Sequence, residues 1–293
     1  MKSNQRFEDL GFVGFFFNRR RNGETLHRRN PPILPPLRPR SRLKPSFDAL
    51  LAHTFQNPNP NSLPLALAIL QQSLRSGCLP APQTRLSLSA AWLRRRRRGA
   101  SVAAALTDMR SVGSGSGYRP DVGTCNYLVE CLCKVDELDE AGRVLGEMGR
   151  VGCDPDSESY GLVVGGMCGA RRAGEAVRLV REMVGAGVVP RQGTAARVVA
   201  AMRADGDVGR AVEVVDGLER EGIRVGFEGY EGLVEGCVEM GEFVLGSRVL
   251  GEMVERGFVP YVRVRQRLVE GLVGVGEVEL ACFVRQKLGE VRS

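Results

Sequence analysis

A period of 35 residues runs through the second half of this 293-residue chain and constrains its fold more than any other feature. Glycine recurs at this spacing four times: Gly152, Gly187, Gly222 and Gly257. Three further columns of small or large apolar residues keep the same spacing: Ala141, Ala176, Ala211, Gly246 and Ala281; Met148, Met183, Leu218, Met253 and Leu288; Leu128, Val163, Val198, Leu233 and Leu268. Repeats of this length are units that cannot bury their apolar faces alone and therefore stack on one another. The sequence predicts an elongated array rather than a closed globule.

The hydrophobic pattern inside each unit predicts two helices. In the first unit, Leu128 and Leu132 lie four residues apart, so a helix places them on one face. A second stripe with spacings of four and three follows: Ala141, Leu145 and Met148. Gly152 suits a left-handed cap, and Pro155 prevents the second helix from continuing. We therefore expect an all-α fold, a right-handed superhelical solenoid of 35-residue helix-turn-helix repeats.

The repeat divides the chain into three parts. The clear repeats fill residues 122–293, in these units: 122–156, 157–191, 192–226, 227–261 and a partial unit at 262–293. Residues 46–121 are expected to hold degenerate helical repeats, with second helices near 64–70 and 103–109 and a Gly/Ser loop at 113–117. Residues 1–45 are rich in Arg and Pro and are expected to be disordered, because they cannot build a core.

The net charge of +7 is distributed unevenly along the chain. Residues 1–121 contain 20 basic and 6 acidic residues (net +14), whereas residues 122–293 contain 21 and 28 (net −7). An Arg-rich, acid-poor leader has the composition of an organellar transit peptide. Mitochondrion is favoured over plastid because Arg dominates the leader and Ser and Thr are sparse. The alternative is a disordered basic tail with no targeting role.

Five consecutive arginines, Arg94–Arg98, form the densest charge in the chain. Such a run is typical of a nuclear address or a nucleic-acid patch. It also follows a stretch with apolar residues at Leu86, Leu88 and Leu93, and a charge run in such a place is more often the solvated end of a helix.

The sequence argues against several other classes of function. No run approaches the ~18 apolar residues of a membrane-spanning helix, so no membrane contact is expected. The eight cysteines form no CxxC pair and the two histidines are His27 and His53, so neither a metal site nor a cofactor is expected. Gly113–Gly117 lacks the Gly-Lys-Ser/Thr ending of a phosphate-binding loop. With no catalytic set of side chains, the chain is not expected to be an enzyme.

One stretch carries a resemblance to a known family. It comprises these segments: Val122–Lys134 (VGTCNYLVECLCK), Glu140-Ala141, Glu147-Met148, Gly152 and Cys153–Asp156. Together with the period, these residues resemble the pentatricopeptide repeat proteins of plant organelles, of the P type. The resemblance covers about 60% of the chain well and up to 80% loosely. It implies that single-stranded RNA lies in a concave groove, with one base read per repeat by two or three side chains.

The resemblance places the base-reading side chains at the fifth residue of each first helix and at the last residue of each repeat. In the first clear repeat these are Asn126 and Asp156, a pair that in this family implies a preference for uracil. The alternative interpretation makes Asn126 a helix-start residue and Asp156 the cap of the next helix. The later pairs depart from the pattern: Gly161 with Arg191, Ala196 with Gly226, and Glu231 with Tyr261, while Gln266 has no partner.

Three further residues are weaker candidates for RNA contact. Lys134 and Arg191 could meet phosphates, and Tyr261 could stack on a base. The resemblance implies an organellar RNA-binding protein that acts in transcript processing, stabilisation or translation. The acidic repeat region and the degenerate reading positions leave an alternative, a protein–protein scaffold in an organellar ribosome or RNA-processing complex. Mitochondrion is the expected location, with plastid as the alternative.

Overall fold

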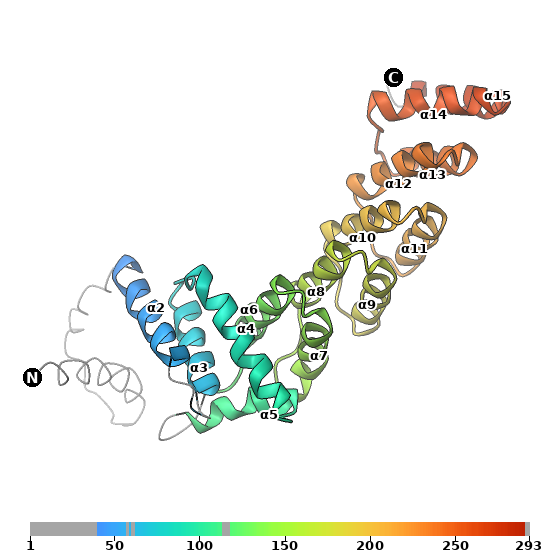
Figure 1. Ribbon diagram of the computed structural model, residues 1–293. Helices are drawn as coiled ribbons and strands as arrows, with labels where there is room; N and C mark the ends of the chain where they lie inside the picture. Colours follow the sequence, from blue (N-terminus) through green and yellow to red (C-terminus); the bar gives the residue numbers. More distant parts are fainter. Residues whose placement is uncertain (1–39, 57–58, 60–61, 113–117, 291–293) are drawn as a thin grey trace, which may run out of the picture. The chain divides into compact units, whose positions relative to one another are not determined.

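The computed structural model describes residues 40–56, 59, 62–112 and 118–290, and in these residues the fold is helical, with no strand (Figure 1). The α-helices are α2 (Arg40–Gln56), α3 (Ser62–Arg75), α4 (Pro82–Arg97), α5 (Val102–Thr107), α6 (Val122–Lys134), α7 (Leu138–Met148), α8 (Ser157–Gly169), α9 (Ala173–Gly185), α10 (Gln192–Ala204), α11 (Val208–Arg220), α12 (Phe227–Met240), α13 (Phe243–Glu255), α14 (Val262–Gly274) and α15 (Val278–Glu290). Short 3-10 turns extend α5 at Asp108–Ser111 and α7 at Gly149–Val151.

The helices from α6 onward follow the period of the sequence without a slip. The first helices of the pairs (α6, α8, α10, α12 and α14) each begin 35 residues after the one before, and so do the second helices from α7 to α15. Each first helix packs against the next first helix, and each second helix packs against its own first helix and the following one. The expected all-α solenoid of helical pairs is thus confirmed. We call the stacked first helices α4, α6, α8, α10, α12 and α14 the first-helix layer.

The tight turn between the two helices of a pair explains part of the high glycine content. One residue of this turn has a positive φ in every clear repeat: Asp136, Arg171, Gly206, Gly241 and Gly276. Glycine adopts this left-handed conformation at no steric cost, whereas other residues pay roughly 1–2 kcal/mol. Asp136 (φ 61°) and Arg171 (φ 58°) therefore sit in strained backbone that the flanking helices impose.

Small residues inside the first helices have a different cause, which is close packing against the preceding second helix. A Cβ added at Gly166 would lie 2.8 Å from Cδ2 of Leu138, and one at Gly236 would lie 3.0 Å from Cγ2 of Val208. These positions are 70 residues apart on both sides of the contact, which is two repeats, so the same pairing of positions recurs along the array. Where the second helix starts with a large side chain, the facing first helix carries glycine.

The N-terminal helical pairs match the expected degenerate repeats in part. Residues 64–70 lie in α3, and residues 103–109 lie in α5 and its 3-10 extension. One boundary is wrong: α2 already begins at Arg40, so residues 40–45 are helical rather than part of a disordered leader. Pro45 interrupts this helix without ending it, and Phe47 and Leu51 pack into the core. The expectations for residues 1–39 and for the loop at 113–117 lie outside the described residues.

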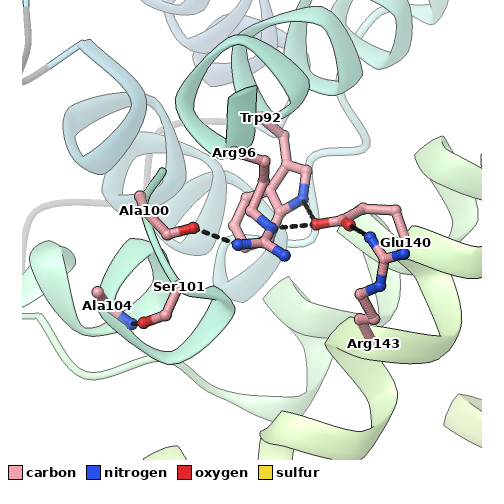
Figure 2. A network of polar contacts seen from close by, with 7 residues as sticks. All are labelled: Trp92, Arg96, Ala100, Ser101, Ala104, Glu140 and Arg143. Carbon is pink, nitrogen blue, oxygen red and sulfur yellow. Dashed lines mark hydrogen bonds and ion pairs between the residues drawn. The ribbon is translucent and has the colours of Figure 1, made fainter. Parts of the chain in front are cut away.

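A buried carboxylate joins the N-terminal pairs to the clear repeats, as Figure 2 shows. Glu140 of α7 is 4% exposed, and its Oε1 accepts hydrogen bonds from Trp92 Nε1 at 3.0 Å and Arg96 Nε at 2.5 Å. Its Oε2 accepts from Arg143 at 2.8 Å. Both Trp92 and Arg96 belong to α4, so this network fixes α4 to α7.

The described residues contain no helix that is long and apolar enough to cross a membrane. In the same part of the chain, no three His, Cys, Asp or Glu side chains gather in a way that could hold a metal ion. The eight cysteines are free thiols, and five of them are buried: Cys78, Cys125, Cys131, Cys153 and Cys237. They pack as small apolar side chains.

Candidate functional site

The structure brings Asn126 and Asp156 together on the first-helix layer. Asn126 lies in the first turns of α6, and Asp156 is the residue that precedes α8 in the next repeat. Asn126 Nδ2 donates to Asp156 Oδ1 at 3.4 Å, across 30 residues of sequence. Asn126 is 8% exposed, whereas Asp156 is exposed to solvent. The pair thus forms a small polar site at the contact between α6 and α8.

A third side chain, Ser159, completes this site and was not expected from the sequence. Its buried Oγ lies 2.6 Å from Asn126 Oδ1 and 2.9 Å from Asp156 Oδ1, and its single proton serves one of the two at a time. The same oxygen accepts a hydrogen bond from the Asp156 backbone at 3.1 Å. The sequence does mark this position, because a residue with a hydroxyl group recurs there every 35 residues: Thr124, Ser159 and Thr194.

Asp156 also caps α8, which confirms the capping interpretation of this residue. Its Oδ1 accepts from the backbone N–H groups of Glu158 at 3.0 Å and Ser159 at 2.8 Å, in a capping box. Burial raises the pKa of Asp156, but the hydrogen bonds from Ser159, Asn126 and Glu158 outweigh it and lower the pKa below its ordinary value. The group is therefore a fixed carboxylate at neutral pH, beside an amide that keeps one hydrogen free to donate.

The corresponding position of the next repeat has no reading side chain on its first helix. Thr194 is the residue of the next repeat that corresponds to Ser159, and Gly161 corresponds to Asn126. The Thr194 hydroxyl oxygen lies 3.8 Å from the position that a Cβ on Gly161 would take. Arg191, which precedes α10, is exposed and lies 3.8 Å from Glu158 in a loose ion pair. Lys134 is the exposed last residue of α6. The structure therefore leaves Arg191 and Lys134 accessible to an anion without joining either to a second reading residue.

Glu231 and Tyr261 meet in a different way from Asn126 and Asp156. The backbone N–H of Tyr261 donates to Glu231 Oε1 at 3.2 Å, while Oε2 is buried without a hydrogen-bond partner. Burial raises the pKa of Glu231, and the nearby charge of Glu235 adds to the rise. The Tyr261 ring is 66% exposed and stands edge to face against Phe227, with centroids 5.3 Å apart. Tyr261 therefore offers an aromatic surface beside a carboxylate that a phosphate would avoid.

Ion pairs between successive first helices neutralise part of the charge on the first-helix layer. Arg203 of α10 binds Glu235 at 2.6 Å and Glu239 at 2.5 Å, both on α12. Arg85 of α4 binds Glu130 of α6 at 3.2 Å. These bridges join successive first helices, and Arg203 neutralises two of the four carboxylates of α12.

Comparison with known proteins places this chain among helical-repeat proteins. Sequence profiles described as "PPR repeat family" and "PPR repeat" match residues 120–169 and 158–188. Among solved structures, the maize pentatricopeptide repeat protein PPR10 aligns at 23% identity over 86% of this chain and 42% of that chain, with a TM-score of 0.49. The PPR domain of Arabidopsis thaliana protein-only RNase P 1, in complex with tRNA, aligns at 18% identity over 59% of this chain and 91% of that chain, with a TM-score of 0.44.

A much higher similarity exists at the level of sequence. The pentatricopeptide repeat-containing protein At1g06270 of Arabidopsis thaliana is 49% identical over 259 residues, which is 88% of this chain and 74% of that protein. A second Arabidopsis thaliana relative, the pentatricopeptide repeat-containing protein At5g46100, is 41% identical over 51 residues, 17% of this chain and 11% of that protein. The first match covers most of both proteins.

Proposed function

This chain belongs to the pentatricopeptide repeat family, and we propose that it binds single-stranded RNA along its first-helix layer. The observation that carries the proposal is the joined Asn126–Asp156–Ser159 site, where two adjacent repeats contribute an amide and a carboxylate. Amides and carboxylates that a rigid helical scaffold holds in place are suited to reading the edge of an unstacked base.

The chemistry of this site supports uracil as the preferred base. The Watson–Crick edge of uracil offers one N–H donor between two carbonyl acceptors. The free amide hydrogen of Asn126 can donate to a carbonyl, and the Asp156 carboxylate can accept from the N–H group. Because the pKa of Asp156 is lowered, the carboxylate is available as an acceptor at neutral pH.

The biological setting is part of the same proposal. The Arg-rich composition of residues 1–45 supports import into an organelle, the mitochondrion in the first place and the plastid as the alternative. There the protein would occupy a transcript and so influence its processing, stability or translation, without a reaction of its own.

We expect the Asn126→Ala variant of the full-length chain to bind a uridine-rich single strand about 5- to 10-fold more weakly, which corresponds to about 1 kcal/mol for a lost hydrogen bond. Binding is measured by fluorescence anisotropy at low salt. Gln266→Ala is the matched control, because Gln266 holds the same position in α14 but is exposed, whereas Asn126 is buried. Thermal unfolding of each variant separates lost contact from lost fold, since Asn126 also bonds to Ser159.

The second candidate function, a scaffold for other proteins, is favoured by the net charge of −7 of residues 122–293 and by the degenerate reading positions. A negatively charged repeat region is poorly suited to an RNA backbone. If the wild-type chain binds no RNA pool even at low salt, the RNA proposal is wrong and the scaffold remains.

A further inference from the structure

The five-arginine run does not act as one unit in the structure. Arg95 forms an ion pair with Asp108, and Arg96 binds the buried Glu140 and the carbonyl of Ala100. Arg95 and Arg96 therefore belong to the packing of α4 against its neighbours, as Figure 2 shows for Arg96. The solvated-end interpretation of the run is incomplete, because two of its five members are structural.

The other three, Arg94, Arg97 and Arg98, lie at the C-terminal end of α4, where Arg98 is the cap residue that follows the helix. Arg97 and Arg98 come three and four residues after Arg94, which places each of them next to Arg94 on the helix surface. All three are exposed, and none of them forms an ion pair or a side-chain hydrogen bond with another described residue. We call them the arginine triad. Three unpaired guanidinium groups on adjacent positions repel one another unless an anion lies between them.

The triad lies at a defined edge of the first-helix layer. Arg97 is the last residue of α4, as Lys134 is the last residue of α6, and both precede a turn with a positive φ, at Gly99 and Asp136. Helix α4 packs against α6, so the triad and Lys134 occupy corresponding ends of neighbouring first helices. The residues that correspond to Lys134 in the later first helices are Gly169, Ala204, Glu239 and Gly274, and Arg203, in the last turn of α10, is paired with Glu235 and Glu239. Exposed positive charge at this end of the layer is thus densest at α4, with Lys134 of α6 and Arg171 in the turn after α8 as single cations.

A helix-dipole effect accounts for only part of this arrangement. Cations in the last turn of a helix are stabilised by about 0.3–1 kcal/mol each, and the effect fades beyond that turn. The helix dipole gives no reason for three arginines to stay unpaired beside one another. Guanidinium groups hold phosphate oxygens in a bidentate fashion, and the triad offers three of them beside a repeat region whose net charge is −7.

We infer that Arg94, Arg97 and Arg98 form a phosphate-binding edge that anchors single-stranded RNA at the C-terminal end of α4, the helix that packs against α6 of the Asn126 site. This inference rests on the proposed function and adds to it. The bases are read between α6 and α8, while much of the affinity comes from the backbone phosphates that the triad holds. Affinity and base selectivity then depend on different residues of the chain.

The test compares two full-length variants that carry the same charge change. In one, Arg94, Arg97 and Arg98 are replaced by glutamine; in the control, three exposed arginines of the α9–α11 region are replaced: Arg181, Arg220 and Arg224. Neither variant touches Arg95 or Arg96, so the contacts of α4 remain. The dissociation constant for a uridine-rich single strand is measured as a function of salt. The slope of log K against log salt falls by about 0.7 for each lost contact with a single strand.

For the triad variant we expect the slope to fall by about 2 and the affinity at moderate salt to drop roughly tenfold, with the preference for uracil unchanged. The control should keep a slope close to that of the wild type. If the wild type binds RNA and both variants show its slope, the inference is wrong and the proposed function stands. If the wild type binds no RNA at low salt, both fail. If the triad variant keeps its RNA slope but loses a co-purifying protein, the triad is a protein contact and the inference is overturned.

Discussion

Replacement of Glu140 by alanine is expected to lower the free energy of unfolding by about 3–5 kcal/mol, the usual cost of removing one partner from a buried ion pair. The reason is that Arg96, with 22% of its side chain exposed, would lose its carboxylate while it stays packed between α4 and α7. The buried Trp92 Nε1–H would lose its acceptor as well. Chemical denaturation followed by circular dichroism measures the change. Glu147→Ala on the same helix is the control; it removes an exposed pair with Arg150 and should cost less than about 1 kcal/mol.

The pH dependence provides a second readout of the same network. Burial raises the pKa of Glu140, but the hydrogen bonds from Arg96, Trp92 and Arg143 and the charge of Arg96 lower it further, so the net pKa lies below its ordinary value. A carboxyl group of this kind stabilises the fold fully above its unfolded pKa of about 4.3, and this contribution is lost as the pH falls through the folded pKa. The difference in stability between the wild type and Glu140→Ala should therefore be constant near neutral pH and shrink below about pH 4. An equal difference at pH 3 and pH 7 would show that the effect comes from packing alone.

The second large effect is expected at Gly271, where α14 packs on the start of α13. A Cβ at this position would lie 2.6 Å from Cζ of Phe243 and closer still to two other ring carbons. Since real Cβ atoms do not approach so closely, Gly271→Ala must displace the ring, and overpacking of this kind costs about 1–3 kcal/mol. Thermal unfolding should show the loss. Gly251→Ala in α13 is the matched control: a Cβ there meets nothing within 4 Å, so helix propensity should stabilise it by up to about 1 kcal/mol.

A double variant tests whether the Phe243 ring is the cause. At the corresponding contact between α9 and α10 the chain itself pairs two alanines, Ala173 and Ala201, and both are buried. Gly271→Ala in a Phe243→Ala background recreates this pair. We expect the cost of the substitution to vanish there, or to turn into a small gain, which is a coupling of about 1–3 kcal/mol. Equal costs in both backgrounds would contradict the packing explanation.

The helix boundaries could be predicted because the period marks them many times over. Each marker residue, such as Gly152 after a second helix, occurs again 35 residues later at the same place in the repeat. A helix boundary that is ambiguous in one repeat can therefore be assigned from the others. The Asn126–Asp156 pairing could be expected only through the family resemblance, because the two residues are 30 apart and meet across a repeat junction. Ser159 was missed because a hydroxyl at a helix start is equally well explained as a local cap.

Other contacts could not be read from the sequence, because they depend on which helix faces which. Nothing in the run Arg94–Arg98 distinguishes Arg96 from its neighbours until α4 is placed against Glu140 of α7, 44 residues later. Gly166 and Gly271 lie inside helices and allow close contacts that a larger residue would block. Their partners lie on a neighbouring helix, and the helical period reports only which face a residue occupies.

The most direct test of the central claim is to map where RNA touches the protein. A uridine-rich single strand is crosslinked to the full-length chain by ultraviolet light, and the modified peptides are identified by mass spectrometry. We expect crosslinks in α6, at the start of α8 around Asp156, and at the C-terminal end of α4. Crosslinks confined to the second helices α7, α9, α11 and α13 would contradict the central claim.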